Sequence, residues 1–271
     1  MPIKELNIFR RHGRQFIPDL RKVVLPPVFR GRPVLDATIL PAEAARVKEL
    51  CPTGAFGTTD LHGVEGNAAC FIDLGSCVFC RECAFALPEK IRFTNDYRLA
   101  ANTREGLIVR QGEDRCISLD ESRIRKEIPT LFRGALKLRQ VSAAGDNSAE
   151  MELNAAGNVN FDMGRFGIEF VASPRHADGI VVTGPISENM AEALQISYDA
   201  VPEPRILVLA GAAAISGGVF KRSAALRRDF TDKNPVDLYV PGCSGRPEAI
   251  IDAAVQAMAI LPISDTGSLA S

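Results

Sequence analysis

Long apolar runs and an excess of charge of one sign are both missing from this 271-residue chain. Its longest apolar run, residues 206–215, fits a buried strand, whereas a helix that spans a bilayer needs about 20 apolar residues. The net charge of −1 provides no basic excess for bulk nucleic-acid binding, and the N-terminus lacks the apolar core of a secretory signal. We therefore expect a protein that is not secreted, does not span a membrane and has no nucleic-acid partner.

Histidine is also scarce, and its three copies form no catalytic pattern. His12, His62 and His176 have no metal-ligand or Ser/His/Asp pattern near them in the sequence. The glycines of residues 210–218 lack the lysine of a G-x4-G-K-[ST] phosphate loop and the spacing of G-x-G-x-x-G. These absences argue against a self-contained enzyme.

The composition that remains is ordinary for a globular protein, with 46% hydrophobic and 24% charged residues and enough length for two modest domains. The first 32 residues are rich in arginine and lysine, and prolines interrupt any long helix there. They form either a solvated basic face or an arm that lies on a partner or near an anionic membrane surface. The seven cysteines fit a reducing cytosol, because four of them belong to one motif.

Cysteine is concentrated in one stretch of the sequence. Cys77, Cys80 and Cys83 have the spacing C-x2-C-x2-C, which puts three thiolates on one tight turn. Bacterial ferredoxins use the run C-x2-C-x2-C-x3-C-P, whose fourth cysteine ligates the other cluster of a two-cluster fold. Here Leu87 occupies the fourth position, and Cys51, followed by proline, matches the closing half of a second run upstream.

The losses in the two runs are complementary. Counting back from Cys51 by the spacing of the motif reaches Val47, Ala44 and Pro41, none of which can ligate iron. One site has therefore lost every ligand, whereas Cys51 and the triad would together hold one complete [4Fe–4S] cluster if the fourth ligand crosses over. Structural zinc on four thiolates and a disulfide framework are the alternative interpretations.

Local patterns predict the elements around these cysteines. Residues 40–50 are typical of a short helix, with apolar residues at 40, 44, 47 and 50 on one face that would fill the volume of the lost cluster. The other expected elements are two strands of a hairpin at 54–60 and 68–73 with Gly63 and Gly66 in the turn, a short helix from Cys83 to Pro88, and a strand at 90–94.

Two cysteines lie outside the motif in this part of the chain. Cys70 falls inside the second hairpin strand, where we expect a buried structural thiol rather than a ligand. Cys116 falls in a polar connection, residues 110–128, where we expect a stray thiol.

The second half of the sequence has a different pattern. Short apolar runs that end in glycine or proline alternate with or precede helical segments, which indicates strands buried on both faces of a parallel α/β sheet. Ligands usually bind at the carboxyl ends of such strands. The expected strands are 179–185, 205–211 and 235–242, and the expected helices are 188–199 and 247–261.

Longer motifs carry a resemblance to a known family over nearly the whole chain. Residues 29–36, 51–55, 94–96 and the cysteine triad resemble the ferredoxin-type subunit of energy-converting hydrogenases and complex I. A second group resembles the small subunit of those hydrogenases, which is similar to the complex I subunit that carries the terminal cluster next to quinone. That group comprises residues 165–168, 172–178, 182–185, 217–220 and 241–243.

The resemblance implies a fusion of two neighbouring subunits. Residues 1–112 would be an N-terminal arm and an α+β bacterial-ferredoxin-like domain that binds a 4Fe–4S cluster, and residues 113–135 would be a linker. Residues 136–271 would be a domain like the hydrogenase small subunit and the complex I 20 kDa subunit, with an α/β flavodoxin-like fold and a parallel sheet.

In that family the small subunit holds a proximal [4Fe–4S] cluster, but this chain departs from the ligand pattern. The family segment Gly-Ser-Cys-Asn-Gly-Cys-Glu-x-Glu corresponds to residues 144–152, where the two cysteine positions are Asp146 and Ala149. The third ligand position is Ala213, and only the fourth, Cys243, keeps its thiol. One thiolate cannot hold a cube, and carboxylate is a hard ligand poorly matched to this chemistry, so we expect no normal cluster there.

The resemblance therefore implies a non-catalytic electron-transfer subunit of a membrane-associated oxidoreductase complex, with one cluster and a degenerate proximal site. The expected partners are a hydrogenase large subunit or complex I 49 kDa-like subunit, and membrane-arm subunits of the same complex. The protein would lie in the cytoplasm, peripheral on the membrane. The alternative is a non-redox scaffold or docking subunit in which the cluster only stabilises the fold.

Overall fold

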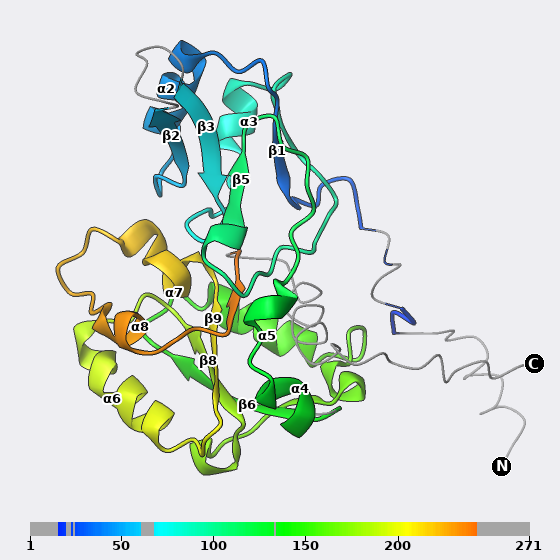
Figure 1. Ribbon diagram of the computed structural model, residues 1–271, viewed down its shortest axis with the longest axis vertical. Helices are drawn as coiled ribbons and strands as arrows, with labels where there is room; N and C mark the ends of the chain where they lie inside the picture. The colour runs from blue at the N-terminus through cyan, green and yellow to red at the C-terminus, as the bar shows by residue number, and fades with distance from the viewer. Residues whose placement is uncertain (1–15, 20–22, 24, 61–67, 133, 243–271) are drawn as a thin grey trace, which may run out of the picture.

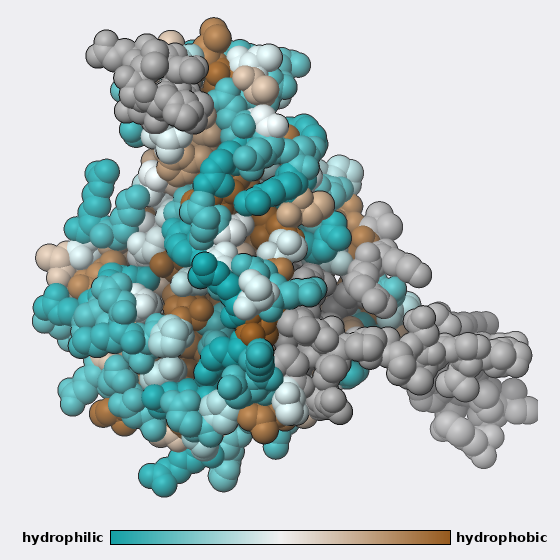
Figure 2. Space-filling view, viewed as in Figure 1, coloured by the Kyte–Doolittle hydropathy of each residue, from teal (hydrophilic) through white to brown (hydrophobic). Residues whose placement is uncertain are grey.

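The computed structural model describes residues 16–19, 23, 25–60, 68–132 and 134–242. Figure 1 shows two units: an N-terminal unit with β1 to β5, and an α/β unit with β6 to β10. None of the helices in these described ranges is both long and apolar enough to cross a membrane. In Figure 2, hydrophilic residues cover most of the visible face of the α/β unit, and hydrophobic residues appear there in small groups.

Two small antiparallel sheets form the N-terminal unit. β2 (Phe56–Asp60) pairs with β3 (Ala68–Asp73), as the hairpin pattern predicts, and β3 also pairs with β5 (Ile108–Arg110). β1 (Pro33–Leu35) pairs with β4 (Ile91–Phe93), which confirms the strand expected near residue 92. The expected turn with Gly63 and Gly66 lies outside the described residues.

The helices of this unit are short and stand beside the cysteines. α2 (Pro41–Leu50) begins with proline at its first position, where the missing N–H costs nothing, and α3 (Glu82–Ala86) follows the cysteine loop. Ala44 and Val47 are buried as predicted. Leu40 and Leu50, expected on the same buried face, are instead 59% and 48% exposed because they lie at the ends of the helix.

The α/β unit contains a five-stranded parallel sheet in the order β10-β9-β8-β6-β7, which confirms the predicted fold class for this half. Numbered along the chain, this order is the 2-1-3-4-5 arrangement of flavodoxin-like folds. The side chains of β8 and β9 are buried on both faces of the sheet, so these strands are continuous apolar runs. The strands are β6 (Leu136–Ser142), β7 (Ile168–Phe170), β8 (Gly179–Thr183), β9 (Ile206–Ala210) and β10 (Leu238–Val240).

Helices cover both faces of this sheet. α6 (Glu188–Asp199) has the predicted bounds and packs Leu194 and Tyr198 against the core, and the expected helix at 247–261 lies outside the described residues. The other helices are α4 (Glu127–Leu131), α5 (Ser148–Ala156), α7 (Ala212–Ser216) and α8 (Asp229–Lys233). Short 3-10 turns lie at Glu105–Leu107, Glu121–Arg123, Met163–Phe166, Pro174–His176 and Gly218–Phe220.

The two units share one hydrophobic core. Buried residues of the N-terminal unit such as Phe56 and Leu74 belong to the same packed cluster as Ile180 and Leu209 of the central sheet. The backbone of Ala101 also pairs with Tyr239 of the edge strand β10, with nitrogen-to-oxygen distances of 3.1 and 2.8 Å in the two directions. The cysteine loop is therefore held against the α/β unit rather than hinged from it.

Replacing Ile180 by alanine should lower the free energy of unfolding by about 2–5 kcal/mol, because the side chain is 0% exposed and its loss leaves a cavity. Ile196→Ala on α6 is the matched control, since Ile196 is 63% exposed and should change stability by no more than about 0.5 kcal/mol. Urea unfolding followed by circular dichroism measures both. Equal losses in the two variants would show that the shared core does not carry the stability.

Candidate metal centre

The end of α2, the loop after β3 and the start of α3 bring the motif cysteines together. Cys51 is the C-cap of α2, Cys77 and Cys80 lie in the loop between β3 and α3, and Cys83 is in the first turn of α3. Cys77 interacts electrostatically with Cys83, Cys51 and Cys80, so the four thiols are neighbours although Cys51 is distant in sequence. All the described cysteines are free thiols, which leaves a disulfide framework without support among them.

Burial dominates the electrostatics of these thiols. The pKa of Cys77 and of Cys83 is raised to about 12, chiefly by burial and in smaller part by the neighbouring thiols. A thiolate in this pocket is therefore costly unless a cation compensates its charge, as a coordinated metal does. The four thiols are therefore donors suited to a metal site.

The cysteine loop has a backbone conformation that aims N–H groups at sulfur. Phe79 N–H donates to Cys77 Sγ at 3.3 Å, and Phe56 N–H donates to Cys51 Sγ at 3.4 Å. Phe79 and Arg81 have φ values of 54° and 71°, a left-handed conformation that costs non-glycine residues about 1–3 kcal/mol. Such strain persists only where the surroundings fix the loop, and it is common at binding sites.

Apolar side chains line the pocket. Phe79 is 3% exposed and packs edge-on against Phe93, with ring centroids 6.1 Å apart. Leu87, at the position of the missing fourth cysteine, is buried and packs in the same cluster as Val47 and Ala44. The positions where a second cluster would need ligands are thus filled by aliphatic side chains.

The thiols are not arranged around a single ion. No three His, Cys, Asp or Glu side chains in the described part of the chain stand close enough together to hold one metal ion. A tetrahedral zinc site requires sulfurs about 4 Å apart, because the Zn–S distance is about 2.3 Å. The arrangement therefore does not match a preformed structural zinc site.

A carboxylate that the sequence pattern did not single out fixes the turn before Cys77. Asp73 accepts hydrogen bonds from Gly75 N–H at 2.9 Å and from the Ser76 hydroxyl at 2.6 Å. Arg104 binds both oxygens of Asp73, at 2.6 and 2.5 Å, in a bidentate pair. An aspartate before Gly-Ser is a turn signal in the sequence, but nothing in the sequence identifies its distant arginine partner.

The remaining cysteines lie apart from this set. Cys70 is 1% exposed in β3, and burial raises its pKa to about 11, in agreement with the expected buried thiol. Cys116 is exposed in the connection between the units. Neither appears among the groups that interact with Cys77.

The degenerate proximal positions meet at the carboxyl edge of the parallel sheet. Asp146 accepts from Ser148 N–H and hydroxyl, at 3.1 and 2.6 Å, and so caps the start of α5. A Cβ atom on Gly211 would lie 3.2 Å from the methyl group of Ala149, and one on Gly218 would lie 3.2 Å from Ala213. Methyl groups and glycine therefore fill this edge, and Cys243 lies outside the described residues.

Glu150 is a buried carboxylate beside this edge that the sequence pattern also did not single out. Its Oε1 accepts from the hydroxyls of Ser142 and Thr183, at 2.6 and 2.7 Å. Its Oε2 has no hydrogen-bond partner among the described residues, although the residue is only 7% exposed. Glu150 thus brings a buried oxygen donor, not a sulfur donor, to this edge.

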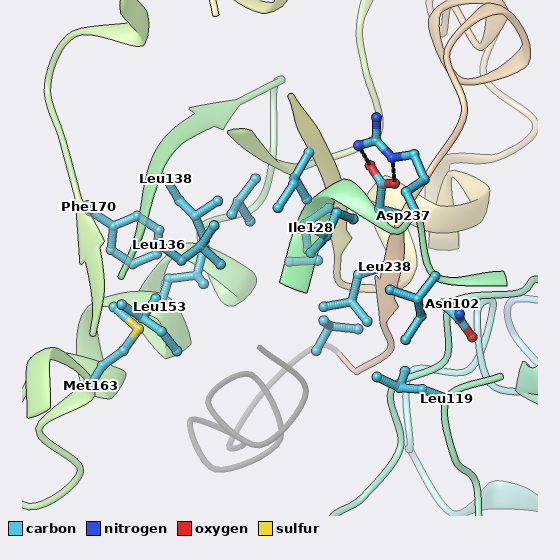
Figure 3. A pocket seen from close by; sticks show the side chains of 18 of the residues that line it. Asn102, Leu119, Ile128, Leu136, Leu138, Leu153, Met163, Phe170, Asp237 and Leu238 are labelled. Carbon is cyan, nitrogen blue, oxygen red and sulfur yellow. Dashed lines mark hydrogen bonds and ion pairs between the residues drawn. The ribbon is translucent and has the colours of Figure 1, made fainter. Parts of the chain in front are cut away.

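A cavity on one face of the sheet is too small for an organic cofactor. Figure 3 shows Leu136, Leu138, Leu153 and other apolar side chains pointing into it, with the Arg125–Asp237 ion pair, at 2.8 Å, on its rim. Its volume is about 50 Å³, far below the roughly 300–1,000 Å³ of small-molecule sites. The cysteine pocket is therefore the stronger candidate for chemistry.

Comparison with known proteins places the α/β unit. Residues 147–257 match the family model "NADH ubiquinone oxidoreductase, 20 Kd subunit". An NADH-quinone oxidoreductase subunit of Desulfovibrio desulfuricans is 45% identical over 111 residues, which are 41% of this chain and 60% of the relative, so the match spans less than two thirds of that relative. The probable membrane-bound hydrogenase subunit mbhJ of Pyrococcus furiosus is 38% identical over 118 residues, which are 44% of this chain and 71% of the relative.

A solved chain of the membrane-bound sulfane sulfur reductase, an archaeal respiratory membrane complex, is 26% identical with a TM-score of 0.43. The match covers 49% of this chain and 73% of that chain, and such a TM-score is too low to establish a shared fold. The family match and the two curated relatives are the stronger findings, because they agree on one family. On that agreement, the chain belongs to the NADH ubiquinone oxidoreductase 20 kDa subunit family.

Proposed function

We propose that this protein is an electron-transfer subunit of a membrane-associated oxidoreductase complex and binds one [4Fe–4S] cluster through Cys51, Cys77, Cys80 and Cys83. The observation that carries the proposal is the convergence of Cys51 with the C-x2-C-x2-C triad in one group of free thiols, of which Cys77 is buried and the other three are partly buried. The curated relatives are subunits of an NADH-quinone oxidoreductase and of a probable membrane-bound hydrogenase, which supports the class of complex.

The donor set suits this cluster better than a single ion. In a cube each cysteine ligates a different iron, so the four sulfurs stand farther apart than around one zinc. When bound, the cluster would take up and release one electron at a time. The protein would hold it with four thiolates, direct the N–H groups of Phe79 and Phe56 at two of the sulfurs, and exclude water with Phe79 and Leu87. Burial and N–H···S bonds are both determinants of cluster potential.

The α/β unit would serve mainly as a docking surface. We propose that it contacts a partner like the hydrogenase large subunit or the complex I 49 kDa subunit, with membrane-arm subunits in the same assembly, and that the protein is peripheral on the cytoplasmic side. Its proximal site would bind no cluster, since Asp146, Ala149 and Ala213 supply no sulfur. Electrons would then leave the single cluster by a route other than the usual relay.

A non-redox scaffold with a structural cluster is the second candidate function. The raised thiol pKa values favour the scaffold and the electron-transfer subunit equally, because both functions need bound metal. A redox titration of the purified chain followed by electron paramagnetic resonance separates the two. A reversible one-electron signal supports electron transfer. A cluster that cannot be reduced without loss of iron supports the scaffold.

Replacing Cys51 by alanine should remove the cluster as completely as replacing Cys80, because each supplies one of only four ligands. Iron and acid-labile sulfide should fall far below four of each per chain in both variants, with loss of the visible absorbance. Retention of full iron by the Cys51→Ala protein would show that the fourth ligand does not cross over.

The controls for this experiment are the other thiols. Cys116→Ala, at an exposed site, and Cys243→Ala, at the surviving proximal position, should both keep the wild-type iron content. A loss of iron in Cys243→Ala would restore the proximal site as a cluster site and refute the single-cluster proposal.

Replacing Asp73 by asparagine should make the cluster easier to remove, because Asp73 holds the turn that presents Cys77 and anchors Arg104. We expect the rate of iron loss to a chelator to rise about 10–100-fold, the usual effect of losing a residue that supports metal ligands. Asp146→Asn is the matched control, since Asp146 accepts hydrogen bonds from Ser148 at the start of α5, at the carboxyl edge of the parallel sheet, and holds none of the four motif cysteines. Equal rates in the wild type and Asp73→Asn would contradict this role.

A further inference from the structure

A lysine of the α/β unit reaches the loop that carries Cys51. Lys221 follows the short helix Gly218–Phe220, and its ammonium group donates a hydrogen bond to the carbonyl oxygen of Thr53. The contact links two residues that are 168 positions apart in sequence and belong to different units. It is therefore a specific contact of the folded chain and not a local feature of either unit.

Gly54 provides the space for this ammonium group. A Cβ atom at Gly54 would lie 2.9 Å from Lys221 Nζ, and its φ of +61° is a conformation that glycine adopts without strain. Any larger residue would push the lysine away from the loop. The contact therefore depends on both units: Gly54 of the N-terminal unit leaves the space, and Lys221 of the α/β unit fills it.

The same loop wraps the sulfur of Cys51. Gly54 N–H donates to the Cys51 carbonyl at 3.2 Å, and the Thr53 hydroxyl lies 3.9 Å from Cys51 Sγ. The ends of such a turn are within about 7 Å of each other, and Lys221 binds the carbonyl of Thr53 inside the turn. The ammonium group is therefore bound to the same turn as Cys51, and salt only partly screens two charges that lie within a Debye length of about 10 Å.

The charge of Lys221 is not neutralised nearby. No carboxylate in the described part of the chain forms an ion pair with it, whereas Arg104, the other cation at this junction, is paired with Asp73. Arg228, behind α7, donates to the carbonyl groups of Ala214 and Ile215, each at 2.8 Å, and does not contact the Cys51 loop. Lys221 is therefore a cation bound to the Cys51 loop without a carboxylate partner among the described residues, whereas Arg30, which donates to the Phe79 carbonyl at 3.0 Å, lies at the triad loop.

We propose that Lys221 raises the reduction potential of the cluster, so that the α/β unit tunes a cofactor held by the other unit. The inference rests on the proposed function, because it requires the cluster at Cys51, Cys77, Cys80 and Cys83. One-electron reduction adds one negative charge to the cluster, and a cation nearby stabilises that charge more than it stabilises the oxidised form. The α/β unit, whose own ligand positions are altered, thereby acquires a role in the electron transfer.

The test is a titration of the full-length chain with dithionite as the electron source, followed by electron paramagnetic resonance. Lys221→Met should shift the midpoint potential to a more negative value, and Lys221→Arg should keep it close to that of the wild type. Lys233→Met is the control for a general charge effect, since Lys233 is an exposed lysine on α8 paired with Asp229, and its midpoint should not change. The shift in Lys221→Met should shrink as salt is added, because Lys221 is an exposed residue.

Lys221→Gln separates charge from hydrogen bonding, because glutamine keeps an N–H donor and has no charge. It should show the same negative shift as Lys221→Met. A wild-type midpoint in Lys221→Gln or in Lys221→Met, with the cluster intact, would overturn the proposed role of the charge. Absence of any four-iron cluster in the wild-type chain would instead overturn the proposed function, so the two failures are distinguishable.

Discussion

The cost of burying sulfur is the constraint on which the N-terminal unit depends. Cys77 and Cys83 lie in an apolar pocket, where burial raises their pKa to about 12, so without metal they remain neutral thiols. A bound metal centre would favour the ionised thiolates instead of the neutral thiols. It would also link the cysteine loop, α2 and α3 through shared coordination. The strained conformations at Phe79 and Arg81 fit the same picture, because a loop built around a central group tolerates local strain that an independent loop would relax.

The two units behave as one body because their junction is both apolar and charged. The hydrophobic core runs from Phe56 and Leu74 into the parallel sheet without a break. At the cysteine loop, a Cβ on Gly75 would lie 2.7 Å from the side chain of Ile215 on α7, so the backbone approaches that helix closely. The α/β unit therefore packs directly against the cysteine loop, even though it supplies none of the proposed ligands.

Local pattern predicts much of this structure, and contacts between distant residues account for what it misses. The buried strands Gly179–Thr183 and Ile206–Ala210 and the helix Glu188–Asp199 follow from apolar periodicity within each segment. The continuous apolar runs used to predict the other strands do not include β6, because Leu136–Ser142 alternates polar and apolar residues, the pattern of a strand that is only half buried. The Asp73–Arg104 pair and the Lys221–Thr53 bond leave no local signal, since each joins residues from separate elements. Cys51 was placed beside the triad only because a ferredoxin spacing specifies a distant fourth ligand.

Family likeness and proposed chemistry lie in different halves of the chain. The family match covers residues 147–257, which include Ala149 and Ala213, the alanines at two positions where the family resemblance leads us to expect cluster ligands. The free thiols that converge lie before that match begins. Likeness alone would predict a cluster at the carboxyl edge of the sheet, whereas the sulfur donors favour one in the cysteine loop. A cluster binds to donors and not to a fold, so under the proposed function the α/β unit positions and tunes a cofactor that it does not ligate.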